Sequence, residues 1–147
     1  MIKYCLDCWN KNQQSLREQL ENDASLNSCE YEYLVKLVTR HILGKEWDAE
    51  NITVVDNGDY QGTLLFLIPR DTYQPSEHEY LMTYVGYGSC SGCDTLQAIQ
   101  ECGENIPTPE QLKDFMSLCK DLVTNMIKPY NTGWRATSDF EPVVMEE

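Results

Sequence analysis

The fold of this chain is decided by the stretch Tyr80-Leu-Met-Thr-Tyr-Val-Gly-Tyr-Gly-Ser-Cys-Ser-Gly-Cys-Asp-Thr-Leu-Gln-Ala-Ile-Gln-Glu-Cys-Gly103. Its first part, residues 80–87, is rich in aromatic and β-branched side chains, which is typical of a strand. Glycines and small serines follow, where side chains would prevent a tight turn of the backbone. Ser91 and Asp94 both suit a helix start, and Gly103 suits its end. The stretch therefore predicts a strand, a glycine-rich elbow and a short helix.

Two helices are predicted before this stretch. Residues 2–21 place Ile2, Leu6, Trp9, Leu16 and Leu20 at spacings compatible with one helical face. A polar break follows at residues 22–28, and Asn27 or Ser28 suits the cap of a second helix that ends near Gly44. We expect both helices to pack an apolar stripe against the rest of the chain.

Two further strands lie between these helices and the elbow. Residues 52–55 suggest a short strand, and Asp56-Asn57-Gly58-Asp59 is typical of a turn. Residues 63–68 form the most apolar segment, which Pro69 ends, and this indicates a central strand. Three consecutive strands with short links and no intervening helix favour an antiparallel meander.

A long C-terminal helix has the clearest start signal in the chain. Thr108-Pro-Glu-Gln111 combines a Thr cap, Pro at the first helical position and Gln three residues after the cap. The apolar face of this helix comprises Leu112, Phe115, Cys119, Leu122 and Met126, and Lys128-Pro129 is the predicted end. The sequence therefore predicts one α+β domain over residues 1–147. It contains two N-terminal helices, a three-stranded antiparallel sheet, a short helix after the elbow and a long C-terminal helix, with residues 132–147 as a loosely packed tail.

The net charge of −13 restricts the partners that the protein can bind. It argues against direct nucleic-acid binding, because phosphates require a basic surface. Residues 51–100 contain six acids and only Arg70 as a base. No apolar run has membrane-spanning length and no signal-peptide core is present at the start, so we expect a cytoplasmic protein without a membrane partner.

Seven cysteines in such a chain favour thiols or ligands over a disulfide framework. Cys5-Leu-Asp-Cys8 and Cys90-Ser-Gly-Cys93 form two C-x-x-C pairs, which together offer the four thiolates of a zinc site. Cys5 lies at the edge of the first helical stripe and Cys8 lies further round the helix, so we expect both to be reachable from outside. The separation of the pairs and the helical setting of the first pair argue against zinc, so no cofactor is the principal expectation and zinc is the alternative.

The elbow cysteines allow three further interpretations. Cys90 and Cys93 resemble a dithiol redox motif at a helix start, although the preceding strands favour an antiparallel sheet rather than a thioredoxin-type unit. Gly88-Ser-Cys90-Ser-Gly92 also matches a cysteine nucleophile elbow, for which only His41 or His78 is available as a base. The structural interpretation is favoured: small residues let the elbow turn sharply, and the cysteines fill space.

A resemblance adds an expectation about origin. Asp59-Tyr-Gln-Gly62, followed by an apolar strand and then by Tyr87-Gly-Ser-Cys-Ser-Gly-Cys-Asp94, resembles a motif of small uncharacterised proteins carried by bacteriophages and mobile elements. The resemblance covers residues 59–94 and no activity comes with it. It implies an accessory role inside a host cell.

Charge and resemblance together give the functional prediction. We expect a non-enzymatic, acidic phage-type protein that binds, and in doing so inhibits, a host nucleic-acid-binding protein such as a defence nuclease. Its predicted binding residues lie in the links that flank the strands, where neighbouring carboxylates would reinforce one another. They are Asp56, Asp59, Tyr60, Gln61, Asp71, Glu77 and Glu79. The alternative is a thiol-redox or zinc protein that works through Cys90 and Cys93.

Overall fold

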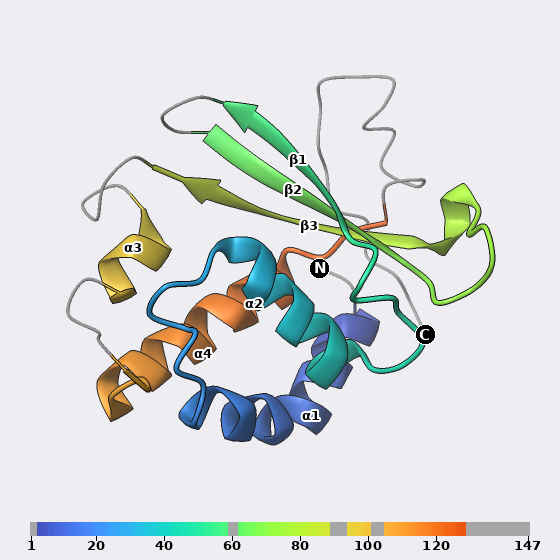
Figure 1. Cartoon of the computed structure of the whole chain (residues 1–147). Helices are drawn as coiled ribbons and strands as arrows, with labels where there is room; N and C mark the ends of the chain where they lie inside the picture. The colour runs from blue at the N-terminus through green and yellow to red at the C-terminus, as the bar shows by residue number, and fades with distance from the viewer. Residues whose placement is uncertain (1–2, 59–61, 89–93, 101–104, 129–147) are drawn as a thin grey trace.

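A computed structural model describes residues 3–58, 62–88, 94–100 and 105–128. Four α-helices and three strands form an α+β fold in which the helices gather on one side of the sheet (Figure 1). The elements are α1 (Lys3–Glu21), α2 (Tyr31–Val38), β1 (Thr53–Gly58), β2 (Gly62–Pro69), β3 (Tyr80–Tyr87), α3 (Thr95–Gln100) and α4 (Pro109–Thr124). This architecture confirms the predicted fold class.

The sheet is the predicted antiparallel meander, in the order β1-β2-β3. The predicted turn at Asp56-Asn57-Gly58 is wrong, because these residues continue β1 and pair with the start of β2. Gly58 lies opposite Gly62, and an added Cβ at Gly62 would come within 2.4 Å of the Asn57 carbonyl oxygen. The ladder hydrogen bonds satisfy the backbone of residues 56–58, which outweighs their local turn preference.

The second helix begins later than the sequence predicts. Glu30, rather than Asn27 or Ser28, precedes its first residue. The Asn27 side chain instead donates to the Asn105 carbonyl oxygen at 2.8 Å and accepts from Gln111 at 2.9 Å, so tertiary contacts replace the expected cap. At its other end α2 continues as a π-helical segment, Thr39–Leu43, and Gly44 ends it as predicted with a φ of +94°.

Helix α4 starts as predicted and ends four residues early. The Thr108 hydroxyl accepts a hydrogen bond from the Gln111 backbone N–H at 3.1 Å. The Thr108 backbone N–H donates to the Gln111 side-chain oxygen at 3.1 Å, which completes a capping box. The chain leaves the helix after Thr124 because Ile127 exchanges two backbone hydrogen bonds with Met82 of β3. The predicted apolar face of α4 is entirely buried.

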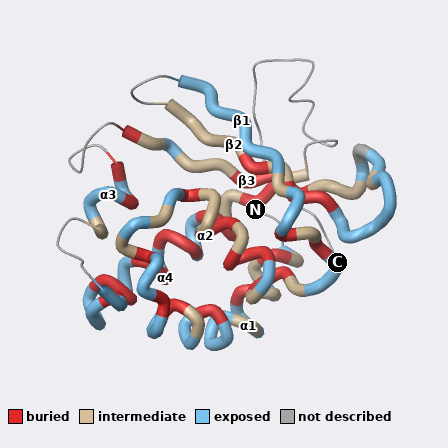
Figure 2. The backbone as a smooth tube through the Cα atoms, in the orientation of Figure 1, coloured by how far each residue is buried: buried red, intermediate tan, exposed pale blue. Residues whose placement is uncertain are grey.

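The core lies between the helices and the inner face of β2 and β3. Phe66 and Ile68 of β2 are fully buried there beside Leu81 of β3. The Thr83 hydroxyl donates to the Leu122 carbonyl oxygen at 2.6 Å and so joins β3 to the end of α4. Strand β1 takes no part in this core, since all six of its residues are exposed (Figure 2).

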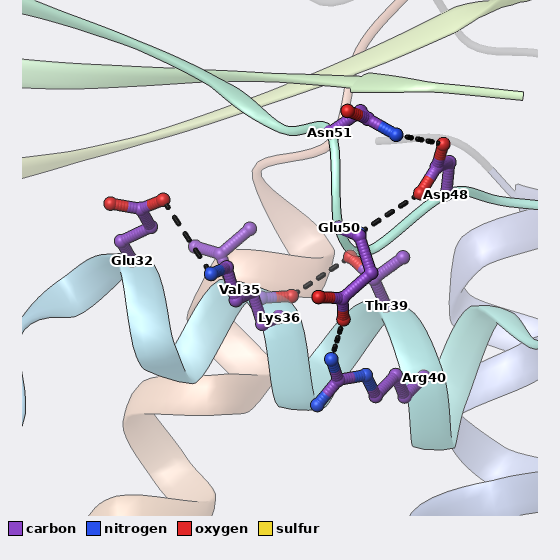
Figure 3. A network of polar contacts seen from close by, with 8 residues as sticks. All are labelled: Glu32, Val35, Lys36, Thr39, Arg40, Asp48, Glu50 and Asn51. Atoms are coloured by element: carbon purple, nitrogen blue, oxygen red, sulfur yellow. Dashed lines mark hydrogen bonds and ion pairs between the residues drawn. The ribbon is translucent and has the colours of Figure 1, made fainter.

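The link into β1 is held against the second helix by a polar network (Figure 3). Arg40 forms an ion pair with Glu50, and the Glu50 backbone N–H donates to Asp48 at 3.0 Å. Asn51 donates to the other Asp48 oxygen at 2.6 Å. The start of β1 therefore has a defined position even though the strand itself is exposed. None of the helices in the described ranges is long and apolar enough to cross a membrane.

Candidate functional site

A cleft of about 400 Å³ opens between β1 and the starts of α2 and α3. Its apolar lining residues, which we call the apolar floor, are Val54, Leu64, Phe66 and Leu96. Its other lining residues are Cys29, Glu30, Tyr31, Glu32, Asp56, Tyr87, Gly88, Asp94, Gln97 and Gln100. We call this site the β1 cleft.

The cleft exists because the helical layer covers only part of the sheet. Val54 and Phe66 are paired neighbours in β1 and β2. Phe66 has no exposed area, whereas 38% of Val54 is exposed. Burial therefore ends abruptly between two adjacent strands, and the inner face of β1 remains accessible at the mouth of the cleft.

The charge of the cleft is one-sided. Among its described lining residues, Glu30, Glu32, Asp56 and Asp94 are acidic and none is Lys or Arg. Glu32 has a weak partner in Lys36, 3.9 Å away on a partly exposed helical turn. Asp56 accepts a hydrogen bond of 2.5 Å from the Tyr87 hydroxyl. A cationic group in the cleft would thus meet several carboxylates above an apolar floor.

Asp94 organises the base of the cleft. It is 5% exposed, and one of its oxygens accepts from the Tyr31 hydroxyl at 2.9 Å and from the Gln97 N–H at 3.0 Å. The other oxygen accepts from the Gly88 N–H at 2.9 Å. Asp94 therefore caps α3, as predicted, and also ties α3 to α2 and to the end of β3.

Tyr31 completes this arrangement from the side of α2. Its hydroxyl donates to Asp94 and accepts from the Leu96 N–H at 3.0 Å, so it bridges two groups of α3. Burial is the main cause that raises the pKa of Tyr31 well above its ordinary value, and the adjacent Asp94 carboxylate adds to it. The phenol therefore stays protonated and keeps its donor role at physiological pH.

Glutamine side chains hold the remaining wall in place. Gln100 donates to the carbonyl oxygens of Leu26 and Cys29, at 2.7 and 3.0 Å, and fixes the turn that precedes α2. Gln97 donates to the Gly88 carbonyl oxygen at 3.1 Å. Because these contacts lock the walls, the β1 cleft is a preformed site.

The described cysteines are poor candidates for thiol chemistry. Cys5 is fully buried, so the prediction that it is reachable from outside is wrong, and Cys8 is only partly exposed. Burial raises the pKa of Cys8, and burial also raises the pKa of Cys29 and of Cys119 to about 12. Such thiols are protonated and unreactive at neutral pH.

The elbow cysteines, Cys90 and Cys93, lie outside the described residues. Cys102 lies outside them as well. Within the described ranges no group of three or more His, Cys, Asp or Glu side chains is arranged to hold a metal ion.

The predicted binding residues divide between the two ends of the sheet. Asp56 lies in the β1 cleft, whereas Asp71 and Glu79 flank the other end, where Pro69 pairs with Tyr80. Strand β2 separates these ends by about 23 Å, which exceeds the Debye length of about 8 Å at physiological salt. The expectation that these carboxylates form one cluster is wrong, because antiparallel strands place successive links at opposite ends.

The other predicted residues have different outcomes. Glu79 is engaged in a capping box with Ser76 at the start of the short 3-10 helix Glu77–Glu79. The side chain of Glu77 is not described, and Asp59, Tyr60 and Gln61 lie outside the described residues. Their described neighbour Gly62 pairs with Tyr87, which places this end of β2 beside the end of β3.

The sequence did not identify the wall that α2 contributes. Glu30 and Glu32 lie at the start of a helix, where acidic residues are common because they suit the helix dipole. Nothing local distinguishes such acids from those of a binding site.

Comparisons of the chain with protein-family models, with curated proteins and with solved structures each found no match.

Proposed function

We propose that this protein is a non-enzymatic acidic accessory protein that binds a basic segment of a nucleic-acid-binding host protein in the β1 cleft. One observation carries the proposal: an open cleft whose described lining combines apolar residues with four carboxylates and includes no Lys or Arg. A Lys or Arg side chain combines an apolar stem with a charged end, so it suits both the floor and the rim. Occupying such a side chain would block the surface that the partner uses for phosphates.

The origin in a bacteriophage or mobile element is part of this proposal and depends on the resemblance of residues 59–94. A host defence nuclease is one target that meets the requirement for a basic surface. The net charge of −13 would speed encounter with such a partner, and the rate would fall as salt rises. Thiol chemistry in the cleft is disfavoured because burial raises the pKa of Cys29, the one described thiol there, to about 12.

The test compares two variants with the same loss of charge. In the cleft variant, Glu30→Gln, Glu32→Gln and Asp56→Asn neutralise the rim. In the control variant, Glu110→Gln, Asp114→Asn and Asp121→Asn neutralise three exposed carboxylates of α4 instead. Both variants and the wild type are used to capture proteins from a bacterial lysate, and captured proteins are then challenged with double-stranded DNA as a competitor.

The proposal expects one or more nucleic-acid-binding proteins to be captured by the wild type and by the control variant. Double-stranded DNA should release the captured proteins, and the cleft variant should not capture them. Equal loss of the captured proteins in both variants would show that net charge alone explains the binding, and it would contradict a role of the cleft. If both variants still capture the same proteins and Cys90→Ser or Cys93→Ser does not, the binding depends on the elbow thiols instead of the cleft.

A further inference from the structure

The two edges of the sheet differ in how they are covered. The edge of β3 is occupied, since Met82 exchanges backbone bonds of 2.9 and 2.8 Å with Ile127. Asn125 adds a side-chain bond of 3.2 Å to the Tyr84 carbonyl oxygen. The segment that follows α4 therefore protects this edge.

The edge of β1 has no such cover within the described part of the chain. No described strand pairs with its outer side, and among the described residues no backbone hydrogen bond from a turn or loop reaches residues 53–58. An exposed edge strand presents alternate N–H and C=O groups to any extended chain, and most proteins guard it with charges, Pro or a bulge. Here Val54 and Val55 are 38% and 42% exposed, and Asp56 is the only charged residue.

This edge adjoins the acidic cleft directly. Successive side chains of a strand point to opposite faces, so Val54 and Asp56 lie on the cleft side and Val55 lies on the other. A strand added beside β1 would lie about 4.8 Å away and would direct every second side chain over the cleft. The acidic side chains of Glu30, Glu32 and Asp56 line this cleft, and we call them its rim.

Charge complementarity selects the occupant. A second copy would bring the same acids against the rim, and like charges placed opposite one another are unfavourable. The C-terminal residues 129–147 are also a poor match, because they contain four acids (Asp139, Glu141, Glu146 and Glu147) and one base, Arg135. An extended segment with Lys or Arg at alternate positions fits both the backbone template and the rim.

We propose that the partner binds by strand addition: a basic, extended segment pairs with the free edge of β1 and places alternate Lys or Arg side chains in the β1 cleft. This inference rests on the proposed function and specifies how the partner is recognised. Backbone pairing would set the orientation of the segment, and the carboxylates would select its alternating charge.

The probe is a fluorescein-labelled peptide of about seven residues in which Arg alternates with Val and Thr. Two further peptides carry N-methyl groups on alternate residues, one on the even positions and one on the odd positions. In an added strand only every second N–H faces β1. One of the two methylated peptides should therefore bind about tenfold or more weakly than the parent peptide, because each backbone hydrogen bond changes the affinity a few-fold. The other methylated peptide should bind like the parent. Affinity is measured by fluorescence anisotropy with the full-length protein.

Three outcomes would overturn strand addition. Equal binding by both methylated series would show that the backbone is not read, and failure of the parent peptide to bind would show that a basic extended segment is not recognised. A dimeric mass in light scattering, together with peptide binding that weakens as the protein concentration rises, would assign the β1 edge to a second copy. In each case the lysate experiment still decides the proposed function, because its cleft and control variants make no assumption about strand pairing.

Discussion

Removing the Tyr31 hydroxyl should cost much of the protein's stability, because that one oxygen serves two buried partners. Tyr31→Phe deletes the bond to Asp94 at 2.9 Å and the bond from the Leu96 N–H at 3.0 Å. A hydrogen bond to a charged group contributes about 1.5–3 kcal/mol, and a buried N–H left without a partner costs about 1–3 kcal/mol. Allowing for partial relaxation, we expect the free energy of unfolding to fall by about 2–4 kcal/mol.

Urea denaturation followed by tryptophan fluorescence measures this change, and Tyr73→Phe is the matched control. Tyr73 is 89% exposed, so the same deletion there should change stability by less than about 0.5 kcal/mol. Asp94→Asn in both the wild-type and the Tyr31→Phe background completes a double-mutant cycle, in which the two changes should be strongly coupled. A Tyr31→Phe midpoint equal to that of the control would refute the view that this network holds α2 and α3 together.

Three further outcomes follow from the core and from its titratable groups. Leu122→Ala should lower the free energy of unfolding by about 2–5 kcal/mol in the same urea assay, since Leu122 is 1% exposed in the core; an unchanged midpoint would contradict its core position. Cys5 and Cys119 are fully buried, and burial raises the pKa of Cys119 to about 12. Both thiols should therefore resist a thiol reagent at pH 7.5 until the protein is unfolded. Mass mapping that finds early labelling of either cysteine would contradict this expectation. Burial, with a smaller effect of Arg40, lowers the pKa of His41 below its ordinary value of 6.5. The folded state thus favours the neutral ring, so the contribution of His41 to the free energy of unfolding is complete above about pH 6.5. That contribution is lost as the pH falls through the lowered pKa of His41. His41→Gln should remove that part of the pH dependence of stability, and an unaltered profile would show that His41 does not cause it.

The elements that the sequence predicted well carry their signals locally. Thr108, Pro109 and Gln111 are sufficient to start α4, because a capping box satisfies its donors within one turn. The boundaries that failed are those that tertiary contacts decide. Asn27 has the chemistry of a cap but bonds to a distant segment, and Ile127 leaves its helix to pair with Met82.

The candidate site was only partly predictable for a different reason. Asp56 was predicted because residues 51–100 contain six acids and one base. Two other acids beside it in the cleft, Glu30 and Glu32, lie more than twenty residues earlier in the chain. Their meeting depends on how far the helical layer extends under the sheet, and no local pattern encodes this. The predicted antiparallel topology already implied that the other acids divide between the two ends of the sheet, but the expectation of one cluster did not take this into account.

The limited reach of the helical layer would also give the proposed binding a source of specificity in a chain with a net charge of −13. Carboxylates spread over a surface attract any basic molecule and select none. The proposed binding would combine three physical effects at the β1 cleft: apolar lining residues for side-chain stems, carboxylates for their charged ends, and a strand edge that pairs with no other strand in the described part of the chain. Each effect imposes its own condition, and only an extended segment with alternating basic residues meets all three. Specificity would therefore come from leaving β1 uncovered, at the expense of an exposed edge that the fold otherwise protects at β3.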